Sequence, residues 1–436
     1  MASPASNDAS VLIVGAGTFG LSTSFHLAKR GYKNVTCLDP WNVPSRSSAG
    51  WDISKIARTE YANPIYTRIA HESLDAWRDL EPFASAKLFH QTGWLYMKPH
   101  DVPPAVASRF ETALQQTKLV GDISQVEYLP DENAIKIKCP LISGDLNGWS
   151  GIFNGNAGWV EAKRSMEVLV EECSRLGVRF ISGPAGTMKS LLRGEHDNEV
   201  LGVVAQDGTE HLADLVILAT GAWSESLLNF EGQLFSGAYN LCHIQLTPEE
   251  AEKYASLPVL NAPTRGYCFP PTKDGIFKIA SLGYTNTNYV DLPAHPQFRV
   301  SVPRDRAFNP TDTLSEESIA ECRKIAQACL PELGDRDLCY SAMCWDTESF
   351  DFNWIISPHP SSTRLFIATA GSGHTFKNLP VVGKYVADCV EGNLPSDLRE
   401  AWRWRPDRVR DFPPLERVDI KSMHGWRHDG KSETDV

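Results

Sequence analysis

The chain lacks the features that mark a membrane protein or a nucleic-acid-binding protein. No stretch of its 436 residues approaches the roughly 20 consecutive apolar residues that span a bilayer. Lysine and arginine (42) are outnumbered by aspartate and glutamate (54), and they form no basic block. The net charge of −12 disfavours binding to polyanions, so we expect no nucleic-acid or membrane partner. A small-molecule partner is favoured.

Paired cysteines and targeting signals are also missing. The ten cysteines form no C-x-x-C pair, and none of the twelve histidines stands at a zinc-type spacing from them. No signal peptide is visible, and the last residues, KSETDV, are not a peroxisomal S-K-L type tripeptide. We therefore expect free thiols, no metal site and a cytoplasmic protein, with peroxisomal import by another kind of signal left open.

A strand, a glycine turn and a helix are predicted near the start of the chain. Val11–Val14 has strand composition, three glycines follow at G-x-G-x-x-G spacing, and Leu21–Arg30 has helical periodicity without proline. Glycines at this spacing permit a tight turn, let the backbone approach a diphosphate and let the helix pack on the strand. The helix N-terminus then faces the diphosphate. The predicted cofactor-binding residues of this turn are Gly15, Ala16, Gly17, Thr18, Phe19 and Gly20.

An acidic residue supports a dinucleotide over a purely structural turn. The apolar run Val35–Leu38 predicts a second strand, and Asp39 stands at its end. In this fold such a carboxylate accepts hydrogen bonds from the adenosine ribose and disfavours a 2′-phosphate. The pattern favours FAD or NAD over NADP, and its place at the start of the chain favours FAD.

The rest of the chain predicts an α/β (α+β) protein of two interleaved domains. We expect a Rossmann-like FAD-binding domain of the glutathione-reductase type and a substrate domain with a mixed or antiparallel sheet. The FAD-binding domain is assigned residues 10–81, 151–235 and, with the C-terminal tail, 339–436, and the substrate domain 82–150 and 236–338. The predicted helices are Pro64–Leu80, Val106–Thr117, Trp159–Leu176, Ser315–Cys329 and one from Gly371 toward Val390.

Two further segments predict cofactor contacts. Asp214–Trp223 reads as an apolar strand ending in Ala-Thr-Gly-Ala, which is typical of the return strand of FAD-binding domains. Leu365–Ala368 predicts a buried strand, after which a glycine-rich helix start offers a second dipole site for an electron-rich flavin edge. The basic residues Lys55 and Arg58 follow the ribose-binding strand, where they would either face the flavin or lie at the solvated surface.

Several motifs in a fixed order resemble one enzyme family. They are SAGWDISKI (Ser48–Ile56), HIQLTPEEA (His243–Ala251), the strand around Lys278, SVPR with PTDT (Ser301–Thr313), AMCW (Ala342–Trp345), GSGHTFKNLP (Gly371–Pro380) and AWRWRP (Ala401–Pro406). With the glycine turn they resemble the monomeric sarcosine oxidase family of FAD amine oxidases, and within it the fungal fructosyl amino acid oxidases, or amadoriases. The resemblance covers nearly the whole chain. It implies oxidation of the C–N bond of a secondary amine, with O2 returning as H2O2.

The resemblance also implies residue roles. Cys344 matches the position that bonds FAD through an 8α-thioether, a buried free thiol being the alternative. Lys278 matches a lysine over the flavin ring that promotes the reaction with O2, and its apolar neighbours Phe277 and Ile279 place it on the other strand face. Lys377 matches the lysine that binds the substrate carboxylate, with Arg58 as a second charge. Lys278 and Lys377 are therefore the predicted catalytic residues. The remaining predicted cofactor contacts are Ser48, Lys55, Gly371, Gly373, His374, Phe376 and Lys377 itself.

The substrate is left open by two features. Amadoriases usually carry an acidic pair shortly after this strand lysine, whereas Ile279, Ala280, Ser281 and Leu282 follow Lys278. The family also has a substrate-reaching arginine beyond AWRWRP, for which Arg408, Arg410 and Arg417 are equal candidates. Fructosyl amino acids are the first substrates to try. The alternatives are an N-methyl amino acid, saccharopine, pipecolate, a natural-product precursor that closes a ring, or a flavin-binding interaction protein without turnover. A monomer is expected.

Overall fold

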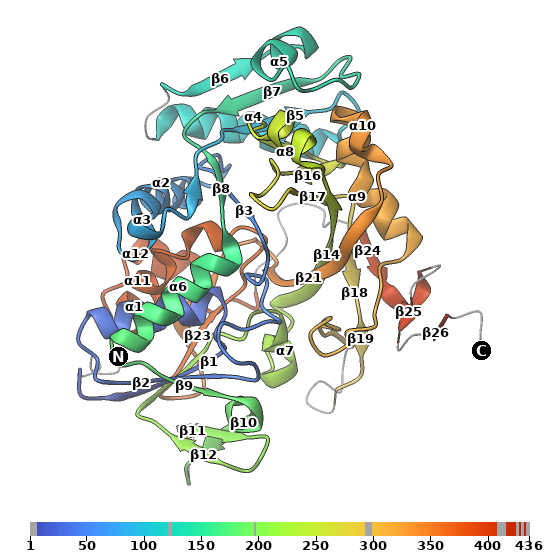
Figure 1. Ribbon diagram of the computed structural model, residues 1–436. Coiled ribbons are helices and arrows are strands. Elements are labelled where there is room, and N and C mark those ends of the chain that lie inside the picture. Colours follow the sequence, from blue (N-terminus) through green and yellow to red (C-terminus); the bar gives the residue numbers. More distant parts are fainter. Residues whose placement is uncertain are drawn as a thin grey trace.

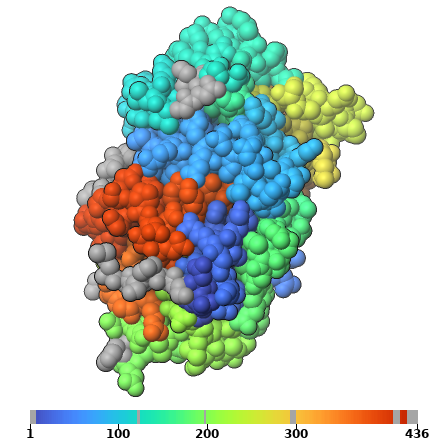
Figure 2. Space-filling view, turned by 90° about the vertical axis from the view of Figure 1, so that its left-hand side faces the viewer, coloured from blue at the N-terminus to red at the C-terminus, as the bar shows by residue number. Residues whose placement is uncertain are grey.

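Two sheets, each covered by helices, form the body of the molecule (Figure 1). The computed structural model describes residues 7–120, 124–195, 198–292, 299–407 and 416–423, together with the backbone at 427–428 and 431–432. Figure 2 shows the blue N-terminal segment next to the orange-red segment from late in the chain, in agreement with the contact between helices α1 (Thr18–Lys29) and α11 (Val382–Val390). Residues far apart in sequence therefore build one body.

The first sheet has six strands in the order β22-β23-β13-β1-β2-β9, all parallel except β22. Along β1, Val11 and Ile13 face the helices, whereas Leu12 and Val14 face a separate three-stranded sheet. Buried side chains therefore cover both faces of this sheet, as a parallel sheet requires. Its strands are β1 Ser10–Val14, β2 Asn34–Asp39, β9 Arg179–Ser182, β13 Leu215–Leu218, β22 Ile355–Pro358 and β23 Leu365–Thr369; the covering helices are α1, α6 Ala162–Arg175 and α11, and the three-stranded sheet is β10 Met188–Arg193, β11 Val200–Ala205 and β12 Glu210–Leu212.

The second sheet has ten strands and is mostly antiparallel, as predicted for the substrate domain. Phe277 and Ile279 pack beneath helix α9 (Glu316–Cys329), whose Cys322 and Ile325 belong to the same core. The other face of the sheet looks toward the first sheet. The strands are β5 Trp94–Lys98, β6 Val126–Leu129, β7 Ser150–Asn154, β14 Leu234–Gln245, β15 Val259–Ala262, β16 Gly266–Cys268, β17 Ile276–Ala280, β18 Tyr284–Thr287, β21 Leu338–Ser349 and β24 Glu416–Asp419.

The two longest strands connect the two sheets. β14 and β21 pair antiparallel along almost their whole length, from Leu234 opposite Ser349 to Ile244 opposite Leu338. Within this pairing Tyr239 lies opposite Cys344. The sequence assigns residues 339–436 to the FAD-binding domain. In the structure, β21, at the start of this segment, is a strand of the larger sheet. The division into five segments remains a proposal.

Three of the five predicted helices are confirmed, and two are wrong in part, the one from Gly371 being described with the site below. α2 (Pro64–Asp79), α4 (Pro104–Leu119) and α9 match their predicted segments within a few residues. The predicted helix Trp159–Leu176 begins instead as strand β8 (Gly158–Val160), and α6 starts only at Ala162. The reason is tertiary: β8 pairs with β3 (Lys55–Ala57) and β4 (Phe89–His90), and such pairing overrides a local helical pattern.

Three further features of the described residues concern membrane spans, thiols and metal ligands. Within these ranges, none of the helices is long and apolar enough to cross a bilayer. All ten cysteines carry free thiols. Among the described side chains there is also no cluster of three or more His, Cys, Asp or Glu that could hold a metal ion.

Candidate active site

A cavity of about 1270 Å³ opens between the two sheets and extends from the glycine turn to helix α4. Of the predicted cofactor residues, the following line it: Gly15, Gly17, Thr18, Phe19, Asp39, Ser48, Lys55, Cys344, Gly371, Gly373, His374, Phe376 and Lys377. Arg58, predicted to bind substrate, lines it too. The predictions therefore converge on one cavity.

The glycine turn has the geometry that its sequence predicts. Gly15 has a φ of +104°, and a Cβ there would lie 2.5 Å from the carbonyl oxygen of Ala219 in the return strand. A Cβ on Gly20 would lie 1.7 Å from the carbonyl oxygen of Gly15, so helix α1 packs on the turn only without a side chain. Ala16 and Gly20 do not line the cavity, and their part is to shape the turn. The N-terminus of α1 opens on the cavity through Gly17 and Thr18.

Asp39 fixes the turn to strand β2. Its carboxylate accepts hydrogen bonds from the backbone N–H groups of Ala16 (2.8 Å) and Trp41 (2.9 Å). Burial raises the pKa of Asp39, and these two donors oppose the rise. A carboxylate has about four acceptor sites, so two used by the backbone leave others for a ribose hydroxyl. The ribose contact itself stays a prediction.

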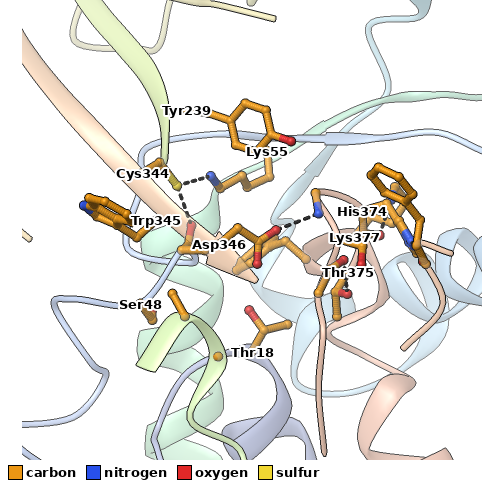
Figure 3. A pocket seen from close by; sticks show the side chains of 18 of the residues that line it. Thr18, Ser48, Lys55, Tyr239, Cys344, Trp345, Asp346, His374, Thr375 and Lys377 are labelled. Atoms are coloured by element: carbon orange, nitrogen blue, oxygen red, sulfur yellow. Dashed lines mark hydrogen bonds between the residues drawn. The ribbon is translucent and has the colours of Figure 1, made fainter. Parts of the chain in front are cut away.

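A buried charged cluster lies against the wall that carries Cys344. The Asp52 carboxylate forms ion pairs with the Lys278 ammonium, at 2.5 Å, and with the Lys55 ammonium, at 2.9 Å. Lys278 also donates to the carbonyl oxygen of Ser54 (2.8 Å). The Lys55 ammonium lies 3.5 Å from the Cys344 sulfur, and Figure 3 shows these two side chains pointing toward one another. One carboxylate therefore holds two lysines in a water-poor site.

The pKa values of Lys278 and Cys344 are shifted by burial, and neighbouring charges oppose each shift. Burial lowers the pKa of Lys278 to about 8, although Asp52 opposes the fall. Burial raises the pKa of the Cys344 thiol, and the Lys55 ammonium opposes the rise. Lys278 is only 1% exposed and lies behind the cavity wall, with its ammonium 4.9 Å from the ring centre of Phe269, which does line the cavity.

Three cations gather at the other end of the cavity, where aromatic rings surround them. The Arg58 guanidinium lies 4.2 Å from the ring centre of Tyr61, and the Lys377 ammonium lies 4.8 Å from the same ring. Arg109 of α4 lies 5.7 Å from the ring centre of Phe352. All three side chains line the cavity. Burial lowers the pKa of Lys377 well below its usual value, and the nearby Arg58 charge lowers it further.

His374 joins this end of the cavity to a loop. Burial and the neighbouring Lys377 lower the pKa of His374 to about 3, so the imidazole is neutral. Its Nε2–H donates to the carbonyl oxygen of Phe352 (2.9 Å), and Lys377 donates to the carbonyl oxygen of His374. In Figure 3, His374, Thr375 and Lys377 stand together on the side of the site opposite Cys344.

The helix predicted to open at Gly371 does not form there, so the predicted second dipole site is wrong. Ser372 and Gly373 adopt φ values of +52° and +71°, which no right-handed helix contains. A short 3₁₀ turn follows at Phe376–Asn378, and α11 begins only at Val382, after Pro380. Gly371 and Gly373 still line the cavity, but as a loop.

The sequence interpretation missed two residues of the site and left a third unresolved. Asp52 stands inside the SAGWDISKI motif without an assigned role, and Arg109 carried no signal beyond a helical segment. Among the tail arginines, Arg417 in β24 stacks on Phe235 at 3.5 Å and does not line the cavity. Arg408 and Arg410 lie outside the described residues.

The cavity fits FAD. A glycine turn and helix N-terminus at one end suit a diphosphate, and the length of the cavity from Asp39 to Lys377 suits an extended dinucleotide with a ring system beside Cys344. The family model described as FAD dependent oxidoreductase matches residues 10–389. The chain belongs to this family of FAD-dependent oxidoreductases. It is an FAD-dependent enzyme of the sarcosine oxidase type that acts on amines.

Individual relatives cover the chain almost completely. The L-saccharopine oxidase of Schizosaccharomyces pombe is 33% identical over 91% of this chain and 93% of its own length. The human peroxisomal sarcosine oxidase is 24% identical over 94% of this chain and 97% of its own. Among solved structures, the fructosyl peptide oxidase from E. terrenum is 34% identical with a TM-score of 0.89, covering 98% and 99% of the two chains. Amadoriase I from Aspergillus fumigatus is 32% identical with a TM-score of 0.87, covering 99% and 100%.

Proposed function

We propose that this FAD-dependent enzyme oxidises the C–N bond of a secondary amine that carries carboxylate groups, forming an imine and, from O2, hydrogen peroxide. The observation that carries the proposal is the convergence of Arg58, Arg109 and Lys377 on one end of a cavity whose other end suits a dinucleotide. Buried cations at this density favour an anionic ligand, because its carboxylates replace the water that the cations have lost.

FAD, held in this cavity, would supply an acceptor for the hydride of the substrate carbon and a donor of two electrons to O2. The protein's part is to bind and orient the amine. A substrate carboxylate beside Lys377 stabilises the charged form of that lysine, while Arg58 disfavours an ammonium on the substrate nitrogen. The amine then reacts as the neutral base, with its C–H bond held in one orientation.

Two substrate classes have support. The three cations favour an amine with carboxylates on both of its substituents, and the relative from Schizosaccharomyces pombe is named for saccharopine. The similarity to fructosyl peptide oxidase and amadoriase structures favours fructosyl amino acids. Against the second class, the segment Ile279–Leu282 supplies no carboxylate for sugar hydroxyls. We therefore place the polycarboxylate amines first.

The experiment is a substrate panel read as peroxide release by the purified enzyme. L-Saccharopine, a fructosyl amino acid, sarcosine and pipecolate are compared, and we expect the highest kcat/KM for the first. Lys377→Met should raise KM strongly for carboxylated amines and little for a decarboxylated analogue. Lys189→Met, on an exposed part of β10, is the matched control. Equal losses for both analogues would show that Lys377 only packs, and peroxide from none of the amines would refute the proposal.

Four further properties of the protein are proposed from its sequence. Covalent attachment of FAD through Cys344, reaction with O2 at Lys278, a monomeric state and a cytoplasmic location are proposals. The proximity of Lys55 to the Cys344 sulfur supports the first of these, because its ammonium opposes the rise that burial causes in the pKa of the thiol.

A further inference from the structure

A row of three polar side chains crosses the larger sheet behind the cavity. His243 of β14 lies directly opposite Lys278 of β17 in one antiparallel pair and directly opposite Tyr340 of β21 in the other. Figure 1 shows β14 with both partner strands beside it. Directly opposite residues share one face of the sheet, with their Cβ atoms about 5 Å apart. His243 therefore lies between Lys278 and Tyr340.

The three residues lead from the interior to the surface. Lys278 is 1% exposed, His243 8% and Tyr340 41%. The rings of His243 and Tyr340 stack with their centres 4.8 Å apart. The His243 Nε2 atom is fully buried and has no hydrogen-bond partner among the described residues. A buried imidazole nitrogen without a partner costs free energy, so its retention calls for an explanation.

The surroundings keep this imidazole neutral. Burial lowers the pKa of His243 to about 4, the Lys278 charge lowers it further, and Asp52 opposes both. On the outer side, the Arg306 guanidinium lies 4.9 Å from the Tyr340 ring centre and donates to the carbonyl oxygen of Ser341. On β21 the Cys339 thiol donates to the His243 carbonyl oxygen (3.5 Å). Burial raises the pKa of Tyr340, the nearby Arg306 charge opposes the rise, and the Asp52 and Asp305 charges add to it. A neutral imidazole has one nitrogen that donates and one that accepts, so it can pass a proton along.

We propose that His243 is a positioning residue that acts through Lys278: it carries protons between the Tyr340 side of the sheet and the Lys278 ammonium. The inference rests on the proposed oxidase function. In the balanced reaction the substrate C–N bond is oxidised by two electrons and O2 is reduced to H2O2, which takes up two hydrogens. One arrives with the electron pair from the substrate carbon. The Lys278 ammonium gives the other, His243 passes a replacement inward, and the proton lost from the substrate nitrogen returns to solvent.

The first test needs no substrate. The holoenzyme is reduced with dithionite, mixed with oxygenated buffer, and followed by flavin absorbance. Wild type should reoxidise fast. His243→Gln keeps a polar side chain that cannot transfer a proton, and its reoxidation should be slower by about tenfold or more. His100→Gln, on an exposed loop, is the control. If His243→Gln does not fold, His243→Asn replaces it. Free imidazole should restore the rate of His243→Ala.

The outcomes separate the two proposals. Slow reoxidation of wild type itself would refute the oxidase function. Fast reoxidation of both wild type and His243→Gln would leave that function intact and overturn the role of His243. Recovery of His243→Ala by imidazole supports proton transfer, because a lost packing contact is not repaired by a free base.

A second readout does not depend on turnover. In the resting enzyme with 13C-labelled histidine, the NMR resonance that disappears in His243→Gln should titrate near pH 4. In Lys278→Met the same resonance should titrate at higher pH, because the cation that disfavours the imidazolium is gone. A resonance that titrates near 6.5 in both proteins would show that His243 does not sense Lys278, and the proposal would be wrong.

Discussion

The Lys278 ammonium lies 2.5 Å from the Asp52 carboxylate, in a place where both side chains are almost completely buried. Asp52 is also shared by Lys55, 2.9 Å away. Burial by itself raises the pKa of Asp52, but the two lysines outweigh it and hold that pKa well below its usual value. Asp52 is thus ionised at every pH at which the enzyme would work, and it supports the charge of Lys278.

Removing this carboxylate should change the pH dependence of the reaction with O2. Because burial lowers the pKa of Lys278 to about 8 and Asp52 opposes the fall, Lys278 loses its proton as the pH rises through about 8. In Asp52→Asn the pKa falls further, so the decline in reoxidation rate should begin at lower pH. The measurement is stopped-flow reoxidation of reduced enzyme from pH 6 to 10. Asp274→Asn, exposed in the turn before β17, should keep the wild-type profile. Identical pH profiles in all three proteins would show that Asp52 does not support the charge of Lys278 during the reaction with O2.

Cys344 should hold the flavin covalently. Its sulfur lies 3.5 Å from the Lys55 ammonium and lines the cavity, whereas Cys339 of the same strand is exposed. Acid precipitation should leave the yellow colour with the wild-type protein, and Cys344→Ala should release it to the supernatant. Cys339→Ser should behave as wild type. Free flavin in the wild-type supernatant would contradict the assignment.

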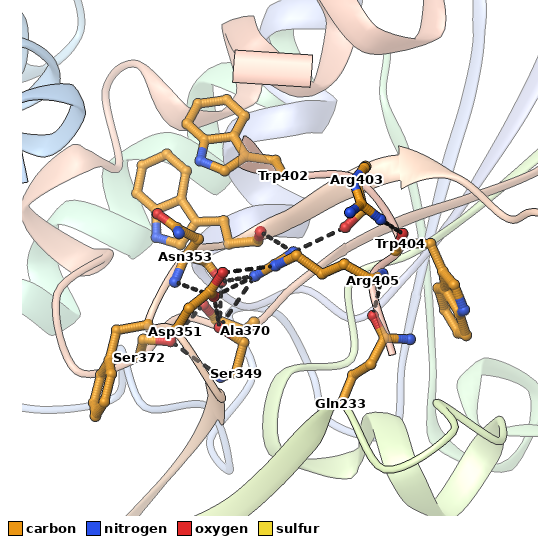
Figure 4. Close-up of polar contacts among 12 residues, drawn as sticks. Gln233, Ser349, Asp351, Asn353, Ala370, Ser372, Trp402, Arg403, Trp404 and Arg405 are labelled. Carbon is orange, nitrogen blue, oxygen red and sulfur yellow. Dashed lines mark hydrogen bonds and ion pairs between the residues drawn. The ribbon is translucent and has the colours of Figure 1, made fainter. Parts of the chain in front are cut away.

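Arg405 of the AWRWRP motif should be a stability residue. Its guanidinium pairs with Asp351 at 2.7 Å and donates to the carbonyl oxygens of Asn353 and Trp354. Figure 4 shows Arg405 beside Asp351 and Asn353. Both side chains of the ion pair are at most 5% exposed. Breaking a buried pair leaves one charge uncompensated, so Asp351→Asn should lower the free energy of unfolding by about 3–5 kcal/mol. Urea titration measures this change.

The control for this pair is two residues away. Arg403 forms partly exposed pairs with Glu400 and Asp407, so Arg403→Gln should lower the free energy of unfolding by only about 0–1 kcal/mol.

Burial raises the pKa of Asp351, but Arg405 outweighs it and lowers the pKa to about 2. The contribution of the pair is therefore present above pH 4 and lost as the pH falls toward 2. Equal losses of unfolding free energy in both variants would mean that the buried pair stabilises the protein no more than the exposed pairs of Arg403.

The sequence predicted the parts of the site that depend on local geometry. The glycine turn and Asp39 follow from chain-local rules, because a tight turn and a strand end need particular residues at fixed spacing. The resemblance supplied Lys278, Cys344 and Lys377, and the structure places all three around one cavity or its wall.

The sequence could not predict contacts that join distant segments. Asp52 and Lys278 are 226 positions apart, so their pairing arises only when the loop after β2 covers the larger sheet. Arg109 reaches the site because α4 lies against the cavity, which no local pattern records. The false helix at Gly371 has the opposite cause: glycines predicted a helix start, whereas Ser372 and Gly373 adopt left-handed backbone angles.

The central claim is that substrate binds in the cavity near Lys377, whereas Lys278, behind the cavity wall, supports the reaction with O2. The most direct test measures both half-reactions by stopped flow in Lys377→Met and Lys278→Met, using L-saccharopine or the best amine of the panel as reductant. The account predicts that Lys377→Met slows anaerobic reduction and leaves reoxidation unchanged, while Lys278→Met slows reoxidation far more than reduction. Equal effects of each substitution on both half-reactions would contradict it.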